Sequence, residues 1–283
     1  MKLFRFGELG KEQPGVLTNG SHLDVSRFGE DYNEAFFEND GLSRLISWLE
    51  VHESECPTVA SDTRFGAVVA RPSKIVCVGL NYKNHALEIG APKPTEPVIF
   101  LKATSAISGP FDNVVIPKDS NQLDWEVELA IVINKKASAV AESEALSFAA
   151  GFTIMMDYSE RFNQLHRGGQ WTKGKSADTF APLGPYLVTQ KDIGNIQDLG
   201  IWLKVNGVSQ QDARTSDMIF SIPHVISYIS RYMTLLPGDV ISTGTPHGIG
   251  FGKKPPQFLK ANDIVEAGIE GIGQLKQLIV NSK

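Results

Sequence analysis

The chain has 283 residues, of which 42% are hydrophobic and 21% are charged, and these proportions exclude disordered and collagen-like proteins. Its 27 Lys and Arg residues and 32 Asp and Glu residues give a formal net charge of −5, which predicts no general affinity for nucleic acid or for an anionic membrane surface. No apolar run approaches the roughly 20 residues that span a bilayer. The chain has two cysteines and begins without an apolar signal segment, so we expect a reduced, cytoplasmic protein.

Residues 1–70 are predicted to form a small N-terminal domain, because they consist of short mixed segments, whereas the rest of the chain is a series of β-like runs. They contain one amphipathic helix, with Asp40 as its N-cap and an end within residues 53–57. The helix is indicated by apolar residues that recur at the spacing of one helical face. These residues are Leu42, Leu45, Ile46 and Leu49.

Residues 71–283 contain many short β-like runs separated by turn residues, and Asn206-Gly207 is a strong hairpin signal. Two helices interrupt these runs, one around residues 143–150 and one from Ser221 to about Met233. Since few helices separate the later strands, repeated βαβ units do not fit, and we predict a mainly β (α+β) domain with a rolled or barrel-like sheet. The predicted strands are 74–79, 98–101, 114–116, 125–134, 152–157, 186–188, 199–205, 240–243, 264–269 and 274–280.

The most informative stretch is the predicted buried strand at residues 125–134, which carries two carboxylates two positions apart. Glu126 and Glu128 point to the same side of a strand, and Trp125 points to the other. Two enclosed carboxylates repel each other and are costly to desolvate, unless a hard divalent cation such as Mg²⁺, Mn²⁺ or Ca²⁺ binds them. The alternative is an edge strand whose polar side faces solvent. Asp157, at the tip of another apolar strand, favours the metal site.

Residues 169–176 read GQWTKGKS and satisfy the phosphate-loop pattern G-x-x-x-x-G-K-[ST]. A phosphate loop lies between a buried strand and a helix. Neither is predicted here, because the upstream residues are polar, and Pro182 and Pro185 exclude a long helix downstream. We therefore expect no nucleoside triphosphate site, and Lys175 remains of interest as a cation on a loop bounded by glycines.

Five separated motifs follow one another along the chain: N-Y-x-x-H-x-x-E at 81–88, W-E-V-E at 125–128, D-x-S-x-R-x-x-Q at 157–164, W-T-K-G-K-S at 171–176 and S-T-G-T-P at 242–246. In this order they resemble the fumarylacetoacetate hydrolase superfamily, from about residue 71 to the C-terminus. Residues 102–106 and 168–171 are similar to the branch that degrades deoxy-sugar acids, often labelled ureidoglycolate lyase. His247 departs from the family pattern, in which many members carry a small or apolar residue.

The resemblance implies a β-roll catalytic domain that follows a small variable N-terminal domain, a homodimer, and a bound Mg²⁺ or Mn²⁺. It also implies three groups of site residues. The metal ligands are Glu126, Glu128 and Asp157. The catalytic residues are a water-activating pair on a short lid helix and a lysine that steadies the anionic oxygens of the substrate, namely His85, Glu88 and Lys175. The substrate contacts are Lys102, Gln164 and Thr245.

These roles imply a metal-dependent hydrolase whose small-molecule substrate is a 2,4-diketo acid, either an acylpyruvate or a diketo-deoxy-sugar acid. The enzyme would cleave a C–C bond of this keto acid and give pyruvate and a second acid. The spacing of His85 and Glu88 agrees, because residues three apart share one face of a helix, and Gly90 is a suitable C-cap. Two alternatives stay open. One is an oxaloacetate decarboxylase or ureidoglycolate-type lyase on the same metal site. The other is a metal-binding protein without catalysis, which would not need His85, Glu88 or Lys175.

Overall fold

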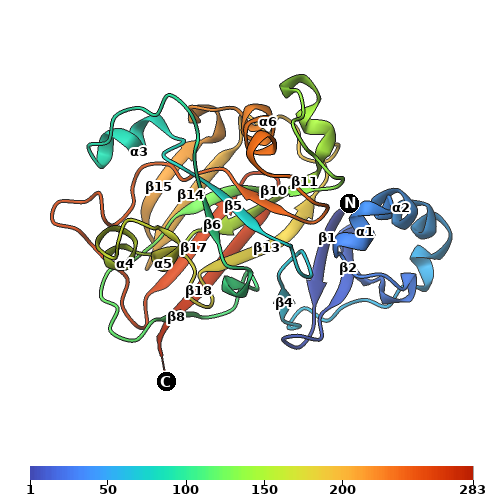
Figure 1. The fold of residues 1–283 in the computed structure, drawn as a ribbon. Coiled ribbons are helices and arrows are strands. Elements are labelled where there is room, and N and C mark those ends of the chain that lie inside the picture. The colour runs from blue at the N-terminus through green and yellow to red at the C-terminus, as the bar shows by residue number, and fades with distance from the viewer. Residues whose placement is uncertain (283) are drawn as a thin grey trace.

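The computed structural model describes residues 1–282, and its core is a large mixed sheet that packs against a smaller one (Figure 1). Two central strands, β10 (Val127–Ile133) and β11 (Ala149–Met156), are buried along their whole length. Their continuous apolar sequences are typical of strands covered on both faces. The prediction of a mainly β fold with few helices is confirmed.

The other strands, in chain order, are β1 (Lys2–Phe6), β2 (Gln13–Thr18), β3 (Ser21–Asp24), β4 (Phe65–Gly66), β5 (Ile75–Gly79), β6 (Val98–Lys102), β7 (Ile107–Ser108), β8 (Val114–Ile116), β9 (Leu123–Asp124), β12 (Ser159–Glu160), β13 (Ala181–Val188), β14 (Gly200–Val205), β15 (Val208–Arg214), β16 (Val240–Ser242), β17 (Ile264–Ile269) and β18 (Gly273–Asn281). Among the described residues, the large sheet has the order β3-β2-β1-β13-β11-β10-β16-β5-β6, with β4 paired to β1 and β7 paired to β13. The smaller sheet has the order β15-β14-β17-β18-β8, and β9 pairs with β12.

The α-helices of the described residues are α1 (Glu34–Glu38), α2 (Gly41–His52), α3 (Lys83–Glu88), α4 (Arg161–His166), α5 (Thr172–Lys175) and α6 (Ile222–Tyr232). Helix α6 confirms the helix predicted from Ser221 to about Met233, and Ser221 caps it by accepting a hydrogen bond from a backbone amide of the first turn. Asp40 is the N-cap of α2, but its side chain makes no capping hydrogen bond and its backbone is left-handed, with φ of 58°. None of these helices has the length and the apolar sequence to cross a membrane.

The helix predicted at residues 143–150 is shorter than expected and differs in type. Residues Glu142–Phe148 form a 3₁₀ helix, and Ala149 already begins β11. The apolar residues at the end of the predicted helix therefore belong to a buried strand. A short apolar run satisfies both patterns, and tertiary packing decides between them.

Strands β1–β3 and helices α1 and α2 form an N-terminal lobe, drawn in blue at the right of Figure 1. Strand β1 pairs antiparallel with β13, so the lobe continues one edge of the large sheet. Arg64 connects the lobe to the rest of the chain through a bidentate pair with Asp112, at 2.7 and 2.6 Å. Within the lobe, Arg64 also contacts Glu12 at 2.9 Å. The domain boundary at residue 70 stays a prediction.

The segment that matches the phosphate-loop pattern follows helix α4 rather than a strand, and its own helix α5 has four residues. Gly174 allows α5 to pack closely on α4, because a Cβ there would lie 2.5 Å from the carbonyl oxygen of Glu160. The described residues thus lack the context of a phosphate loop. The segment instead buries Lys175, whose side chain is 2% exposed.

Candidate active site

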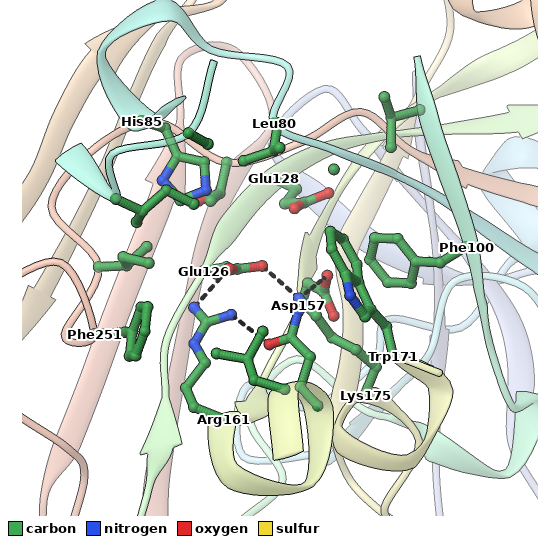
Figure 2. Close-up of a pocket in the computed structure, with 18 residues that line it drawn as sticks. Leu80, His85, Phe100, Glu126, Glu128, Asp157, Arg161, Trp171, Lys175 and Phe251 are labelled. Atoms are coloured by element: carbon green, nitrogen blue, oxygen red, sulfur yellow. Dashed lines mark hydrogen bonds and ion pairs between the residues drawn. The ribbon is translucent and has the colours of Figure 1, made fainter. Parts of the chain in front are cut away.

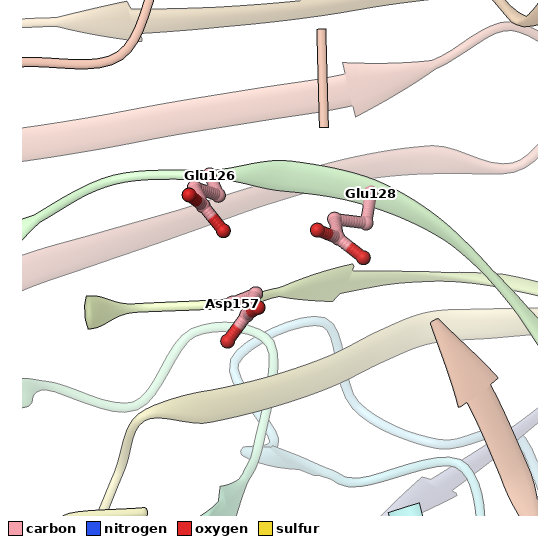
Figure 3. A group of neighbouring side chains, drawn as sticks. All are labelled: Glu126, Glu128 and Asp157. Atoms are coloured by element: carbon pink, nitrogen blue, oxygen red, sulfur yellow. The ribbon is translucent and has the colours of Figure 1, made fainter. Parts of the chain in front are cut away.

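Three buried carboxylates converge where strands β10 and β11 meet at one end (Figure 3). Glu126 directly precedes β10 and Glu128 lies within it, and both project to one side, as the strand periodicity predicts. Asp157 follows β11, and its amide donates a hydrogen bond of 2.9 Å to the Glu126 carbonyl oxygen. One oxygen atom from each of the three side chains lies within 4.8 Å of the others. Their burial excludes the alternative of a solvent-facing edge strand.

Lys175 enters this cluster from the end of α5. Its Nζ donates to Glu126 Oε2 and to Asp157 Oδ2, both at 2.7 Å. Burial on its own would lower the pKa of Lys175, but the two carboxylates outweigh burial and raise that pKa. For Glu126, burial raises the pKa, and Lys175 and Arg161 outweigh it and hold the pKa far below its ordinary value. Lys175 is therefore a fixed, charged member of the cluster and not a solvated loop lysine.

Arg161, at the start of α4, is a site residue that sequence reasoning did not assign. Its buried guanidinium donates to Asp124 at 2.9 Å, to Glu126 at 2.7 Å, and to the side-chain oxygen of Gln164 at 2.9 Å. These carboxylates outweigh the effect of burial and raise the pKa of Arg161 above its ordinary value. A signal was present in the sequence, because Arg161 is part of the motif D-x-S-x-R-x-x-Q. Only the fold shows that it connects a triad carboxylate to Asp124 and Gln164.

Glu128 is the least compensated carboxylate of the triad. It accepts hydrogen bonds from the Ser242 hydroxyl and, at 2.9 Å, from the Gly244 amide. Burial, with Asp157 and Glu126 close by, raises the pKa of Glu128 to about 8. Three buried oxygen ligands with this excess of negative charge fit a hard divalent cation, whose charge would offset theirs.

Residues 244–252, which we call the glycine strap, hold three site carboxylates through backbone amides. Two of its glycines, Gly244 and Gly248, have φ of 99° and 102°, in the left-handed region that glycine favours. Sequence reasoning missed the strap, because a contact through a backbone amide requires no particular side chain. The amide-to-carboxylate pairs, at 2.7 to 3.1 Å, are Gly244 to Glu128, Gly248 to Glu88, and Gly250 and Phe251 to Asp124.

His85 and Glu88 share one face of helix α3, as predicted, and His85 Nδ1 lies 3.5 Å from Glu88 Oε2. The His85 Nδ1 atom is buried and makes no hydrogen bond within the described residues. Gly90 closes the helix with φ of 70° and a hydrogen bond from its amide to the Leu87 carbonyl. Because Glu88 binds the Gly248 amide, the glycine strap ties this helix to the carboxylate cluster.

The carboxylates form the floor of a cavity of about 250 Å³. Figure 2 shows His85 on the opposite side of the carboxylates from the helices that carry Arg161 and Lys175, facing the same space. Lys102 does not line this cavity; its Nζ binds Asp157 Oδ1 at 2.5 Å and the Tyr158 carbonyl at 3.1 Å, behind the triad. The predicted site residues that line the cavity are His85, Glu126, Glu128, Asp157, Gln164, Lys175 and Thr245.

Residues 74–280 match the family described as fumarylacetoacetate (FAA) hydrolase C-terminal. The chain is 45% identical over 281 residues to a 2,4-didehydro-3-deoxy-L-rhamnonate hydrolase from Sphingomonas sp. (strain SKA58), and the match covers 99% of this chain and 96% of that one. Among solved structures, it is similar to fumarylacetoacetate hydrolase from psychrophilic Exiguobacterium antarcticum, with 34% identity, 100% coverage of both chains and a TM-score of 0.87. It is also similar to maleylpyruvate hydrolase from Sphingobium sp. SYK-6 in complex with manganese(II) ion and pyruvate, with 27% identity, 100% coverage of both chains and a TM-score of 0.83. The resemblance seen in the five motifs is confirmed, and the chain belongs to the fumarylacetoacetate hydrolase family as an enzyme of the hydrolase type.

Proposed function

We propose that this enzyme depends on a divalent metal ion and cleaves the C3–C4 bond of a 2,4-diketo acid, giving pyruvate and a second acid. The observation that carries the proposal is the convergence of the buried carboxylate triad, the ion-paired Lys175 and the imidazole of His85 on one cavity. The names of two relatives, 2,4-didehydro-3-deoxy-L-rhamnonate hydrolase and maleylpyruvate hydrolase, support this substrate class.

Glu126, Glu128 and Asp157 would hold Mg²⁺ or Mn²⁺ through their carboxylate oxygens. When bound, such an ion supplies a Lewis acid that polarises carbonyl oxygens and stabilises the negative charge of an enolate. The manganese named for the similar maleylpyruvate hydrolase structure supports an ion of this kind. The protein residues around the triad position the substrate and move the proton.

His85 is placed to activate water, because its imidazole lines the cavity and is shielded from bulk solvent. Its Nδ1 faces the carboxylate of Glu88 at 3.5 Å, and contacts of this kind tighten when substrate binds. A carboxylate at Nδ1 keeps the proton on that nitrogen, so Nε2 is left as the base. In this reading, His85 is the general base and Glu88 is its orienting partner.

In the proposed reaction, the oxygen of water bonds to the C4 carbonyl carbon while its proton passes to His85. The C3–C4 bond then breaks, its electron pair stays on the pyruvate fragment as an enolate, and the proton returns to C3. Lys175 places a positive charge beside the developing enolate. Gln164 contributes a directed donor: because its side-chain oxygen accepts from Arg161, its amide N–H groups remain for a substrate oxygen.

The test compares hydrolysis of an acylpyruvate with decarboxylation of oxaloacetate by the same Mg²⁺-loaded enzyme. His85→Ala should reduce hydrolysis by about 10²–10⁴-fold, the usual contribution of a general base. Decarboxylation should fall much less, since carbon dioxide leaves without an attack by water. His247→Ala is the matched control, because His247 is exposed and does not line the cavity.

Equal losses in both reactions would show that His85 binds substrate or holds the lid instead of activating water. A wild-type enzyme that releases pyruvate only from oxaloacetate would replace the hydrolase proposal with a decarboxylase.

A further inference from the structure

The cavity has a charged floor and apolar walls. Phe100 and Trp171 form one wall, with ring centroids 5.3 Å apart and planes at 62°. Figure 2 shows Phe251 on the other side of the carboxylates. Leu165 and Ile249 add further apolar surface. Under the proposed function, the pyruvate half of the substrate lies on the floor, because the triad is there. The acyl tail that extends from C4 then lies between the apolar walls.

The cations of the cavity are already paired with groups of the floor. Apart from the imidazole of His85, Arg161 and Lys175 are the only basic side chains among the described residues that line it. Arg161 donates to Glu126 and Gln164, which line the cavity, and to Asp124, which does not. Lys175 bridges two carboxylates of the triad. Their charge is therefore balanced where they lie. The carboxylate and the enolate of the pyruvate half bind at the same floor. No basic side chain is then left between the walls to pair with a second carboxylate.

We propose that the enzyme selects 2,4-diketo acids whose acyl tail is uncharged and rejects those with a second carboxylate at the end of the tail. This inference rests on the proposed function and adds the chemistry of the tail to it. An ionised tail carboxylate would lose its hydration between the aromatic walls without gaining a cation, which strongly disfavours its binding. An uncharged tail that ends in a methyl group gains from burial against the same rings.

Phe251 is the specificity-determining residue that the geometry points to. Its backbone amide donates to Asp124 at 3.0 Å, and Asp124 also pairs with Arg161 at 2.9 Å. The hydrogen bonds of Asp124 therefore fix the backbone that carries the Phe251 ring. Its amide donates to none of the three triad carboxylates, so a changed side chain at this position alters the wall without removing a metal ligand.

The experiment compares two acids of equal chain length with the full-length, Mg²⁺-loaded enzyme. One is 2,4-dioxoheptanoate, which ends in a methyl group, and the other is 2,4-dioxoheptanedioate, which ends in a carboxylate. The wild type should hydrolyse the first with kcat/KM about 100-fold higher or more. Phe251→Arg supplies a cation at the wall and should move this ratio toward the dicarboxylate by about 100-fold.

Two control variants separate the local charge from other effects. Phe251→Leu keeps the wall apolar and should retain the preference for the uncharged acid. His247→Arg adds the same charge at an exposed residue outside the cavity and should also leave the preference as it is. Thermal unfolding of each variant shows whether it is folded.

Equal hydrolysis of the two acids by the wild type would overturn the proposed selection and leave the proposed function standing. Hydrolysis of neither acid would overturn the proposed function, and the selection with it. A folded Phe251→Arg variant with an unchanged ratio would overturn the role of Phe251. The wild-type comparison needs no substitution, so it decides the proposal even if that variant does not fold.

Discussion

Gly252→Ala tests how the lid pair is positioned, because Gly252 lies against the side chain of Glu88. A Cβ added at Gly252 would lie 2.4 Å from both Cγ and Cδ of Glu88, whereas ordinary contact begins at 3.4 Å. The φ angle of Gly252 lies outside the left-handed region, so alanine brings no backbone strain of that kind. The methyl group therefore acts as a wedge that displaces the Glu88 carboxylate by about 1 Å, a shift large enough to affect catalysis.

The expected loss follows from the contacts that this displacement breaks. Glu88 accepts hydrogen bonds from the Gly248 amide at 3.0 and 3.1 Å and faces His85 Nδ1 at 3.5 Å. A hydrogen bond to a charged group contributes about 1.5–3 kcal/mol. Since about 1.4 kcal/mol corresponds to a tenfold change in rate, kcat for hydrolysis should fall by about 10–100-fold. KM should change little, because Gly252 does not line the cavity.

Steady-state kinetics with an acylpyruvate measures this loss, and oxaloacetate decarboxylation serves as the second readout that should fall less. Gly200→Ala is the matched control, because a Cβ at Gly200 would meet its nearest neighbour, Glu270, at an ordinary 3.5 Å. A double-mutant cycle with Glu88→Ala isolates the mechanism. If the wedge acts through Glu88, Gly252→Ala should cost little in the Glu88→Ala background. The same loss in both backgrounds would refute the reasoning.

Two further predictions concern the metal and the N-terminal lobe. Metal affinity should fall about tenfold for each pH unit below about 8, because the raised pKa leaves Glu128 protonated in the metal-free protein and a ligand must lose its proton to bind. Calorimetric titration with Mg²⁺ and Mn²⁺ at several pH values measures this; Glu128→Gln should abolish binding, and a pH-independent affinity would contradict the prediction. Arg64→Ala should lower the free energy of unfolding by about 1–3 kcal/mol, because Asp112 and Glu12 lose their partner while partly buried. Urea unfolding measures this loss. The control is Arg27→Ala, which removes an exposed ion pair and should change the free energy of unfolding by no more than about 0.5 kcal/mol.

The local parts of the site could be predicted from the sequence, because each depends on the periodicity of one element. Glu126 and Glu128 share a side of a strand, and His85 and Glu88 share a face of a helix. Arg161 could not be given its role in this way. Its partner Asp124 is 37 residues away and reaches it through the pairing of β9 with β12. Contacts between segments depend on topology, which a pattern within one segment does not contain.

Elements of the fold that the sequence did not predict have physical reasons of the same kind. Strands β1, β2 and β3 have six residues or fewer, and their burial comes from neighbouring elements, so no strict alternation marks them. The resemblance implies that Lys102 contacts substrate, and this stays a prediction; in the structure its Nζ pairs with Asp157 and with the Tyr158 carbonyl. The packing of β6 against the core decides from which side Lys102 approaches the carboxylate. The residue type alone does not specify that side.

In the glycine strap, the side chains can vary, but the number of residues and the path of the backbone cannot. It holds Glu128, Glu88 and Asp124 through amides, so its length and its backbone path matter more than its side chains. An inserted or deleted residue would misalign Glu128 of the proposed metal site, Glu88 of helix α3 and Asp124, the partner of Arg161, together. A point substitution at an exposed position such as His247 leaves all three contacts in place. New substrate preferences can therefore arise by exchange of side chains along the strap, while the catalytic floor is inherited unchanged.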